Sequence, residues 1–174
     1  MLVCHCIAHR FALACEEAAK GNMLAQYVEC NMHSIINYFS HSSKRREHLA
    51  CIQKALRVLT FVVLNLVATR WLSRGNALER IHVNLRPLYV MFKEDAEPPA
   101  TVVTAVALVA LFSSYKFILS ATIFRDILSR LNIVSKCFQK DHVKYSDVRE
   151  VIDAAKEGFK TEYLSKSDNG ESML

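Results

Sequence analysis

Apolar residues recur every three or four positions along most of this chain, which is the spacing of amphipathic helices. In the first half the spacing predicts helices over residues 8–20 and 23–41, and a third that begins at a cap on Ser42 or Ser43. In the second half a helix over residues 73–92 contains Pro87, which should kink it or split it in two.

The least polar stretch covers residues 100–124, and two interpretations of it stay open. It either begins a long buried helix that continues to Phe138, bent near residues 120–122, or it spans a membrane. Lys116 lies past the middle of such a span, where its ammonium group can reach the interface. Helical spacing continues into a charged segment, which favours the buried helix.

The two ends differ from this pattern. Residues 2–7 read as the end of a buried strand, whose ladder partners would lie before Met1. We expect a last helix capped by Asp147 and a disordered tail over residues 165–174. The predicted fold is all-α, an irregular bundle of about six helices with a strand remnant at residues 1–7. One domain covers residues 1–164, with helical parts at 8–97 and 98–164.

Composition agrees with long helices in a single domain. The chain has 174 residues, of which 52% are hydrophobic, with four glycines and three prolines. Such scarcity of turn-forming residues excludes a protein built from many short strands.

Positive charge gathers in one segment, residues 43–86. It contains nine lysines and arginines and two acids, Glu47 and Glu79, so its net charge is +7. Since the net charge of the whole chain is +5, the other residues together are net negative. A basic band of this kind is what an anionic partner requires. Lys44, Arg45 and Arg46 occupy the first turn of a predicted helix, where they oppose the helix dipole. Either an anionic contact or solvation of surface charge accounts for them.

The only tryptophan lies in Thr69-Arg70-Trp71-Leu72-Ser73-Arg74. The Arg70 and Arg74 guanidinium groups can bind phosphate oxygens, and the Trp71 ring can stack on an unpaired base. The alternative is that Trp71 is a core residue beside solvated arginines.

Six cysteines and seven histidines raise the question of metal. Cys6 and His9 have the spacing of half a zinc site, but no second pair follows at a suitable distance. The cysteines lack a disulfide pattern, so we expect reduced thiols, no metal and no cofactor. We find no phosphate loop and no nucleophile or carboxylate set with catalytic spacing.

Several motifs together resemble hAT-superfamily transposases and their domesticated relatives. Cys6-Ile7-Ala8-His9-Arg10-Phe11-Ala12-Leu13-Ala14 is similar to the family's Cys-x-x-His-Arg-Leu-x-Leu-Ala motif, with Phe11 where leucine is usual. Phe39-Ser40-His41-Ser42-Ser43-Lys44-Arg45-Arg46 resembles its phenylalanine and Ser-x-Lys-Arg element, and Thr69-Arg70-Trp71 matches its Thr-Arg-Trp signature. The order and spacing of these motifs, continued through residues 115–139, also resemble those of the family. The resemblance is greatest to zinc-finger-associated hAT-like proteins.

The resemblance implies a fragment of a larger architecture. In that family a helical insertion interrupts an RNase H-like core after a strand, so residues 2–6 would end that strand. The catalytic aspartates would lie before Met1 and the catalytic glutamate beyond Leu174. The tryptophan that matches Trp71 assists the handling of flipped DNA bases in active relatives, which would give Trp71 and Arg70 a role.

We therefore expect a truncated, catalytically inactive protein, located in the nucleus or alternatively the cytoplasm. Its expected activity is weak binding of DNA or a single strand through the segment from Lys44 to Arg86. The binding residues would be Arg70, Trp71, Arg74, Lys44, Arg45 and Arg46. The alternatives are a scaffold that binds proteins through exposed apolar helix faces, and a membrane-associated protein that uses residues 100–124.

Overall fold

The computed structural model describes residues 7–40, 42–58, 74–98, 102–139 and 144–164. In these residues it contains eight α-helices and no strand, so the all-α prediction is confirmed. The helices are α1 (Ile7–Lys20), α2 (Met23–Ser40), α3 (Ser43–Ala55), α4 (Arg74–Val83), α5 (Leu85–Ala96), α6 (Val103–Phe112), α7 (Tyr115–Cys137) and α8 (Tyr145–Phe159), followed by the π-helix η2 (Lys160–Leu164). Of the predicted strand only Ile7 is described, and it begins α1.

The predicted helix over residues 73–92 is split in two. α4 and α5 meet at Asn84, whose amide N–H still bonds to the carbonyl oxygen of Arg80 (3.2 Å). Pro87 lies in the first turn of α5, where an amide N–H would have no partner within the helix. Ser42 caps α3 as predicted, since its hydroxyl oxygen accepts the amide N–H of Arg45 (3.3 Å).

The bend predicted near residues 120–122 is wrong. The chain turns between α6 and α7, whose axes differ by 72°. The Ser113 hydroxyl donates to the Val109 carbonyl oxygen (2.9 Å) as α6 ends. Ser120 and Thr122 donate in the same way to carbonyls four residues earlier (2.6 and 2.8 Å), but inside a continuous α7. These hydroxyls therefore bond to the helix without interrupting it.

The start of α8 also differs from its prediction. Lys144 precedes the helix as its N-cap residue, and Asp147 lies within the first turn. There the Asp147 carboxylate interacts favourably with the positive end of the helix dipole without capping it.

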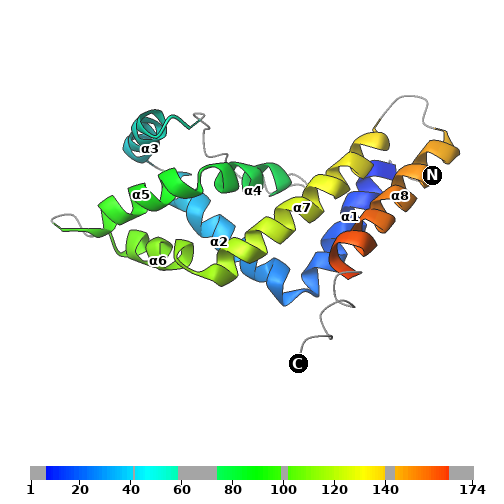
Figure 1. The fold of residues 1–174 in the computed structure, drawn as a ribbon, viewed down its shortest axis with the longest axis horizontal. Coiled ribbons are helices and arrows are strands. Elements are labelled where there is room, and N and C mark those ends of the chain that lie inside the picture. The colour runs from blue at the N-terminus through cyan, green and yellow to red at the C-terminus, as the bar shows by residue number, and fades with distance from the viewer. Residues whose placement is uncertain (1–6, 41, 59–73, 99–101, 140–143, 165–174) are drawn as a thin grey trace, which may run out of the picture.

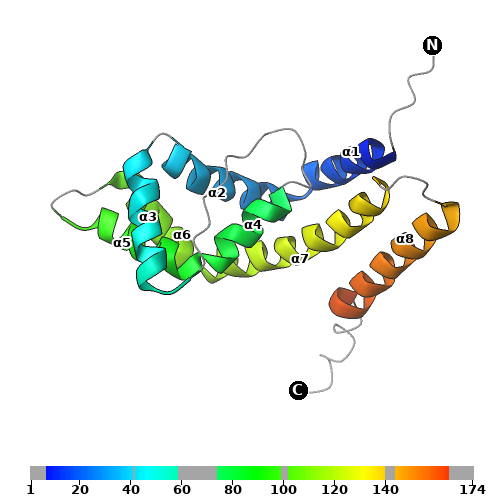
Figure 2. The same cartoon turned by 90° about the horizontal axis from the view of Figure 1, so that it is seen from above.

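The helices form an elongated bundle in which α7 connects two groups (Figures 1 and 2). One group contains α2 to α6, where α6 packs along α5 and α3 crosses above α5. The other contains α1 and α8, which lie on either side of the second half of α7. Among the described residues, the main packing contacts of α8 are with α7 and the π-helix that follows it.

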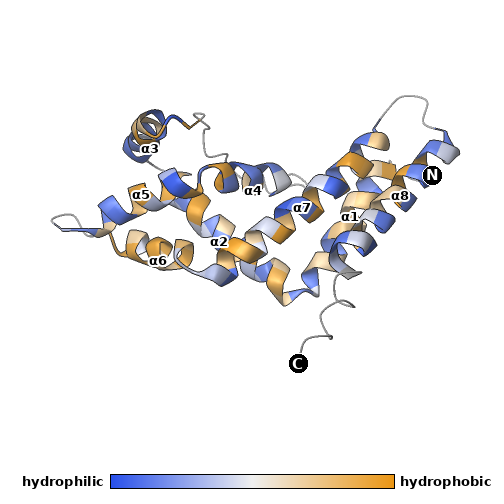
Figure 3. Ribbon diagram, in the orientation of Figure 1, coloured by the Kyte–Doolittle hydropathy of each residue, from blue (hydrophilic) through white to orange (hydrophobic). Residues whose placement is uncertain are grey.

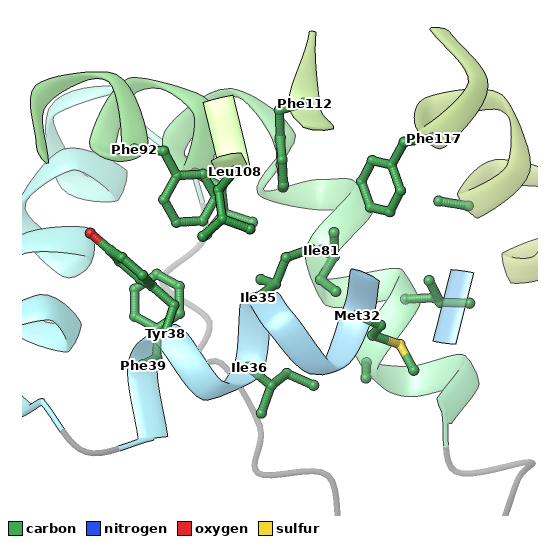
Figure 4. Packing of buried hydrophobic residues seen from close by; sticks show 14 of the residues in the cluster. Met32, Ile35, Ile36, Tyr38, Phe39, Ile81, Phe92, Leu108, Phe112 and Phe117 are labelled. Atoms are coloured by element: carbon green, nitrogen blue, oxygen red, sulfur yellow. The ribbon is translucent and has the colours of Figure 1, made fainter. Parts of the chain in front are cut away.

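Aromatic rings connect four helices in the core of the larger group. The Tyr38 ring on α2 lies 5.2 Å from Phe92 on α5, which lies 5.2 Å from Phe112 on α6. Phe112 in turn lies 5.6 Å from Phe117 on α7. Ile35 fills the space beneath these rings, as Figure 4 shows. Ring contacts of this kind contribute beyond the apolar area that they bury.

α6 is apolar on nearly every turn (Figure 3). Ala105, Leu108 and Phe112 are buried, whereas Val103 and Val106 are 82% and 48% exposed. Among the described residues no single helix is long and apolar enough to cross a membrane. Only the bent pair of α6 and α7 would pass such a test, by length and composition together.

Candidate nucleic-acid interface

The basic motif at the start of α3 contacts the end of α2. Arg45 Nη1 donates to the Tyr38 carbonyl oxygen (2.9 Å), and Arg46 Nη1 donates to the carbonyl oxygens of Phe39 (3.0 Å) and Ser40 (3.4 Å). The last carbonyls of a helix lack amide partners and carry partial negative charge, which guanidinium groups stabilise. The end of α2 therefore offsets the unfavourable placement of these cations at the start of α3.

Arg45 makes a second contact with α2. Its guanidinium carbon lies 3.9 Å from the centroid of the Tyr38 ring, and the Tyr38 hydroxyl donates to Asp95 of α5. Burial, and then the hydrogen bond to Asp95, raises the pKa of Tyr38 above its ordinary value. Arg45 is half-buried, whereas Lys44 and Arg46 are exposed. Arg46 already donates to the end of α2, so Lys44 is the residue of this motif whose side chain makes no contact of this kind with the described residues.

The second predicted motif lies largely outside the described residues. Arg70 and Trp71 are among the residues not described, so their role stays a prediction. Arg74 begins α4, and its Nη1 atom lies 2.7 Å from Oε1 of Glu29 on α2. The Arg74 side chain is only 18% exposed, so this ion pair joins two helices and leaves little of the guanidinium accessible.

Five other cations of α3 and its surroundings are exposed, and their side chains form no ion pair or hydrogen bond with any described residue. Tyr89, 36% exposed, lies between two of them on α5, with the spacing of one helix face. We call this group the basic face: Lys44, Lys54, Arg57, Arg86, Lys93 and Tyr89.

Polar contacts at both ends of α3 hold it against α5. Gln53 Nε2 donates to Oδ1 of Asn84 (2.7 Å) in the buried interior. Nearer the start of α3, His48 Nε2 lies 2.9 Å from Oε2 of Glu94. Because Asn84 immediately precedes α5, the Gln53 contact brings Lys54 to the basic end of that helix.

Arg57 has a backbone conformation that usually requires glycine. Its φ is 55°, and it is the only described non-glycine residue with a positive φ. The amide N–H of Arg57 bonds to the Lys54 carbonyl oxygen (3.1 Å) and that of Val58 to the Gln53 carbonyl oxygen (3.0 Å), a Schellman motif. An arginine held here at a conformational cost is a candidate for a functional contact.

The acids of these helices gather at the opposite end of α5. Glu94 and Asp95 are adjacent to His48, whose Nδ1 lies 3.9 Å from Oδ1 of Asp95. Glu97 follows as the C-cap residue. Within α3, Glu47 is exposed. Positive charge is therefore most concentrated where α3 ends and α5 begins, at Lys54, Arg57 and Arg86, whereas Lys44 and Lys93 lie nearer the acidic end.

Sequence reasoning missed Tyr89 and Lys93, because the basic segment was defined only to Arg86. The signal in the sequence that could have identified these residues is their spacing. Arg86, Tyr89 and Lys93 are separated by three and four residues, so a helix through this segment places them on one face. Their significance depends on α3 lying beside that helix, which the sequence does not reveal.

Cys6 and His9, which have the spacing of half a zinc site, are not both among the described residues. Cys6 lies outside them, and His9 is an exposed residue of α1 that already interacts with another group. In the described part of the chain no three His, Cys, Asp or Glu side chains gather to hold a metal ion. α1 and the basic face lie at opposite ends of the molecule (Figure 1).

Comparisons with known proteins add no further residues to this site. No protein-family model matches the chain, and no curated protein or solved structure is significantly similar to it.

Proposed function

We propose that this chain is a non-catalytic, transposase-derived helical module that binds single-stranded nucleic acid in the nucleus. The observation that carries the proposal is the basic face, with its exposed cations and an exposed tyrosine among them. The predicted contribution of Arg70 and Trp71 remains part of the proposal. The proposed transposase origin is based on the sequence resemblance to hAT transposases, and the all-α fold is compatible with that origin.

The chemistry of the basic face fits a flexible strand. Lysine and arginine side chains neutralise phosphates along the backbone, while a tyrosine ring accepts a stacked base of any identity. Arg45, Arg46 and Arg74 are engaged with α2, so their substitution would affect the fold together with any binding.

The test is a titration of a fluorescent single strand at several salt concentrations. For a single strand the logarithm of the affinity falls with the logarithm of salt by about 0.7 per phosphate contact. Combining Lys54→Gln with Arg86→Gln should therefore lower this slope by about 1.4 and weaken binding at low salt. The matched control is Arg149→Gln with Lys156→Gln on α8, which removes the same charge at the other end of the molecule.

Two results would contradict the proposal. One is the absence of binding at low salt, and the other is an equal loss of affinity in the control variant, which would indicate attraction by net charge alone.

Arg57→Gly separates binding from folding. Glycine relieves the left-handed conformation of residue 57, so the free energy of unfolding should rise by about 1 kcal/mol while affinity for the strand falls. Urea denaturation and the same titration measure the two effects. If the variant is more stable and binds the strand equally well, Arg57 does not contribute to binding.

A protein-binding scaffold is the second candidate, favoured by the apolar surface around α6 and the start of α7. Val103 and Tyr115 are 82% and 78% exposed, and Val106 and Leu119 are 48% and 43% exposed. Sedimentation over a range of concentrations, with and without Val106→Glu, tests this surface in self-association. Flotation with neutral lipid vesicles tests its use in membrane association, and loss of flotation in the same variant would favour that alternative.

A further inference from the structure

A groove lies between α2, the start of α3 and α6. It shares no lining residue with the basic face, although Arg45 of the groove follows Lys44 in the chain. Its volume is about 410 Å³, within the range of small-molecule sites. The apolar part of its wall comes from Tyr38, Ala107 and Leu108. Figure 4 shows Leu108 beside the aromatic core and the Tyr38 hydroxyl pointing away from it.

The polar part of the wall contains one cation and no acid. Arg45 contributes its guanidinium group, and Asn37 and Thr104 contribute an amide and a hydroxyl from facing helices. Among described residues, Nη1 is the only side-chain donor of Arg45 that makes a hydrogen bond, and its acceptor is the Tyr38 carbonyl oxygen. Stacking on the Tyr38 ring and this bond hold the guanidinium in place before any ligand arrives.

We propose that this groove binds a small organic anion, a carboxylate on an apolar body. The apolar body would contact Tyr38, Ala107 and Leu108, and the carboxylate would accept hydrogen bonds from the remaining Arg45 donors and from Asn37 or Thr104. Arginine suits this role because its planar fork matches a carboxylate. The occupant is anionic because the charge of the wall is positive.

The experiment is an amide NMR titration of the full chain with 3-phenylpropionate and with its neutral analogue 3-phenylpropanol. The acid should cause saturable shifts at Asn37, Tyr38 and Ala107, and bind about tenfold more tightly than the alcohol, the usual effect of one charge-assisted hydrogen bond. In Arg45→Gln the two compounds should bind equally.

Two matched controls make the result specific. Arg46→Gln also removes a guanidinium from the end of α2, but Arg46 does not line the groove, so the preference for the acid should persist. Ala107→Leu should block both compounds by filling the groove. Ala110→Leu, on an exposed part of α6 outside the groove, should bind as the original chain does.

The proposal is overturned if the acid causes no saturable shifts, or if acid and alcohol bind the original chain equally. It is also overturned if folded Arg45→Gln keeps the preference, if folded Arg46→Gln loses it, or if Ala107→Leu leaves binding unchanged. Should Arg45→Gln fail to fold, the comparison of the two alanine variants still decides whether the groove is the site. Retention of strand binding by Ala107→Leu would show that the groove and the basic face act separately.

Discussion

Single side chains orient helices that are distant in the sequence. The Tyr38 hydroxyl donates to Asp95, and burial with this hydrogen bond raises the pKa of Tyr38. A phenol whose pKa is higher in the folded state stabilises the fold fully below its ordinary pKa of 10.0. The contribution is lost as the pH rises above that value, because the unfolded chain then releases the proton first.

Tyr38→Phe should lower the free energy of unfolding by about 1.5–3 kcal/mol at neutral pH, since a part-buried hydrogen bond to a carboxylate is lost. Above pH 10 the difference between the two chains should narrow by about 1.4 kcal/mol per pH unit. Urea denaturation at a series of pH values measures this, with the exposed Tyr115→Phe as the control. Parallel pH profiles would contradict the assignment.

The buried hydrogen bond between Gln53 and Asn84 is a second single contact that connects distant helices. Asn84→Ala leaves the Gln53 amide without its acceptor, and should lower the free energy of unfolding by about 1–3 kcal/mol. Combining Gln53→Leu with Asn84→Leu should be less harmful than the single change, because the Gln53 Nε2 donor that loses Asn84 is then removed as well. Asn76→Ala on the exposed side of α4 is the control. A double variant less stable than Asn84→Ala would contradict this account.

At the scale of elements, α4 and α7 approach closely at Gly75. A Cβ atom there would lie 2.9 Å from Asn132 Nδ2 and 3.1 Å from Leu128 Cβ. Asn132 can move, but the Leu128 Cβ is fixed by its helix.

Gly75→Ala should therefore lower the free energy of unfolding by about 1–2 kcal/mol, despite the higher helix propensity of alanine. Gly158→Ala is the matched control, because its Cβ would meet only the movable end of Arg130. We expect a change of at most about 0.5 kcal/mol there, since the propensity gain offsets the displacement. Thermal or urea denaturation compares the two, and equal effects would contradict the importance of the α4–α7 contact.

The elements show what periodicity can and cannot predict. In the helix predicted over residues 23–41, Ile35 and Phe39 are four positions apart and therefore on one apolar face, and both are at most 1% exposed. The break at Ser113 was missed because a serine hydroxyl bonds to the carbonyl four residues earlier both at a helix end and within one. The partners of Arg45 and Arg46 could not be predicted either, since those carbonyls meet them only when α2 and α3 form a corner.

At the scale of the whole molecule, stability is unevenly distributed. No described side chain of α8 is fully buried, and in the described part of the chain its main packing contacts are with α7 and η2. Arg130 of α7 contacts both α8 and η2. It forms an ion pair with Glu162 of η2, and its guanidinium carbon lies 5.8 Å from the centroid of the Phe159 ring at the end of α8.

We expect the amides of α8 to exchange hydrogen at least about tenfold faster than those of α5, since protection follows buried contacts. Arg130→Ala should accelerate exchange in α8 further and leave α5 unchanged. Arg149→Ala, an exposed change within α8, is the control. Equal protection of α8 and α5 would show that the bundle unfolds as one unit.

The attachment of α3 through its inner side has a consequence for how this surface can change. His48, Gln53 and the buried Leu49 and Ile52 hold α3 in place, while Lys44 and Lys54 form no ion pair or hydrogen bond with any described residue. The outer residues can therefore be exchanged, even for acids, while the architecture persists. The residues available to a partner are therefore different from those that maintain the fold. A chain of the same shape could bind a partner of opposite charge after a few surface substitutions.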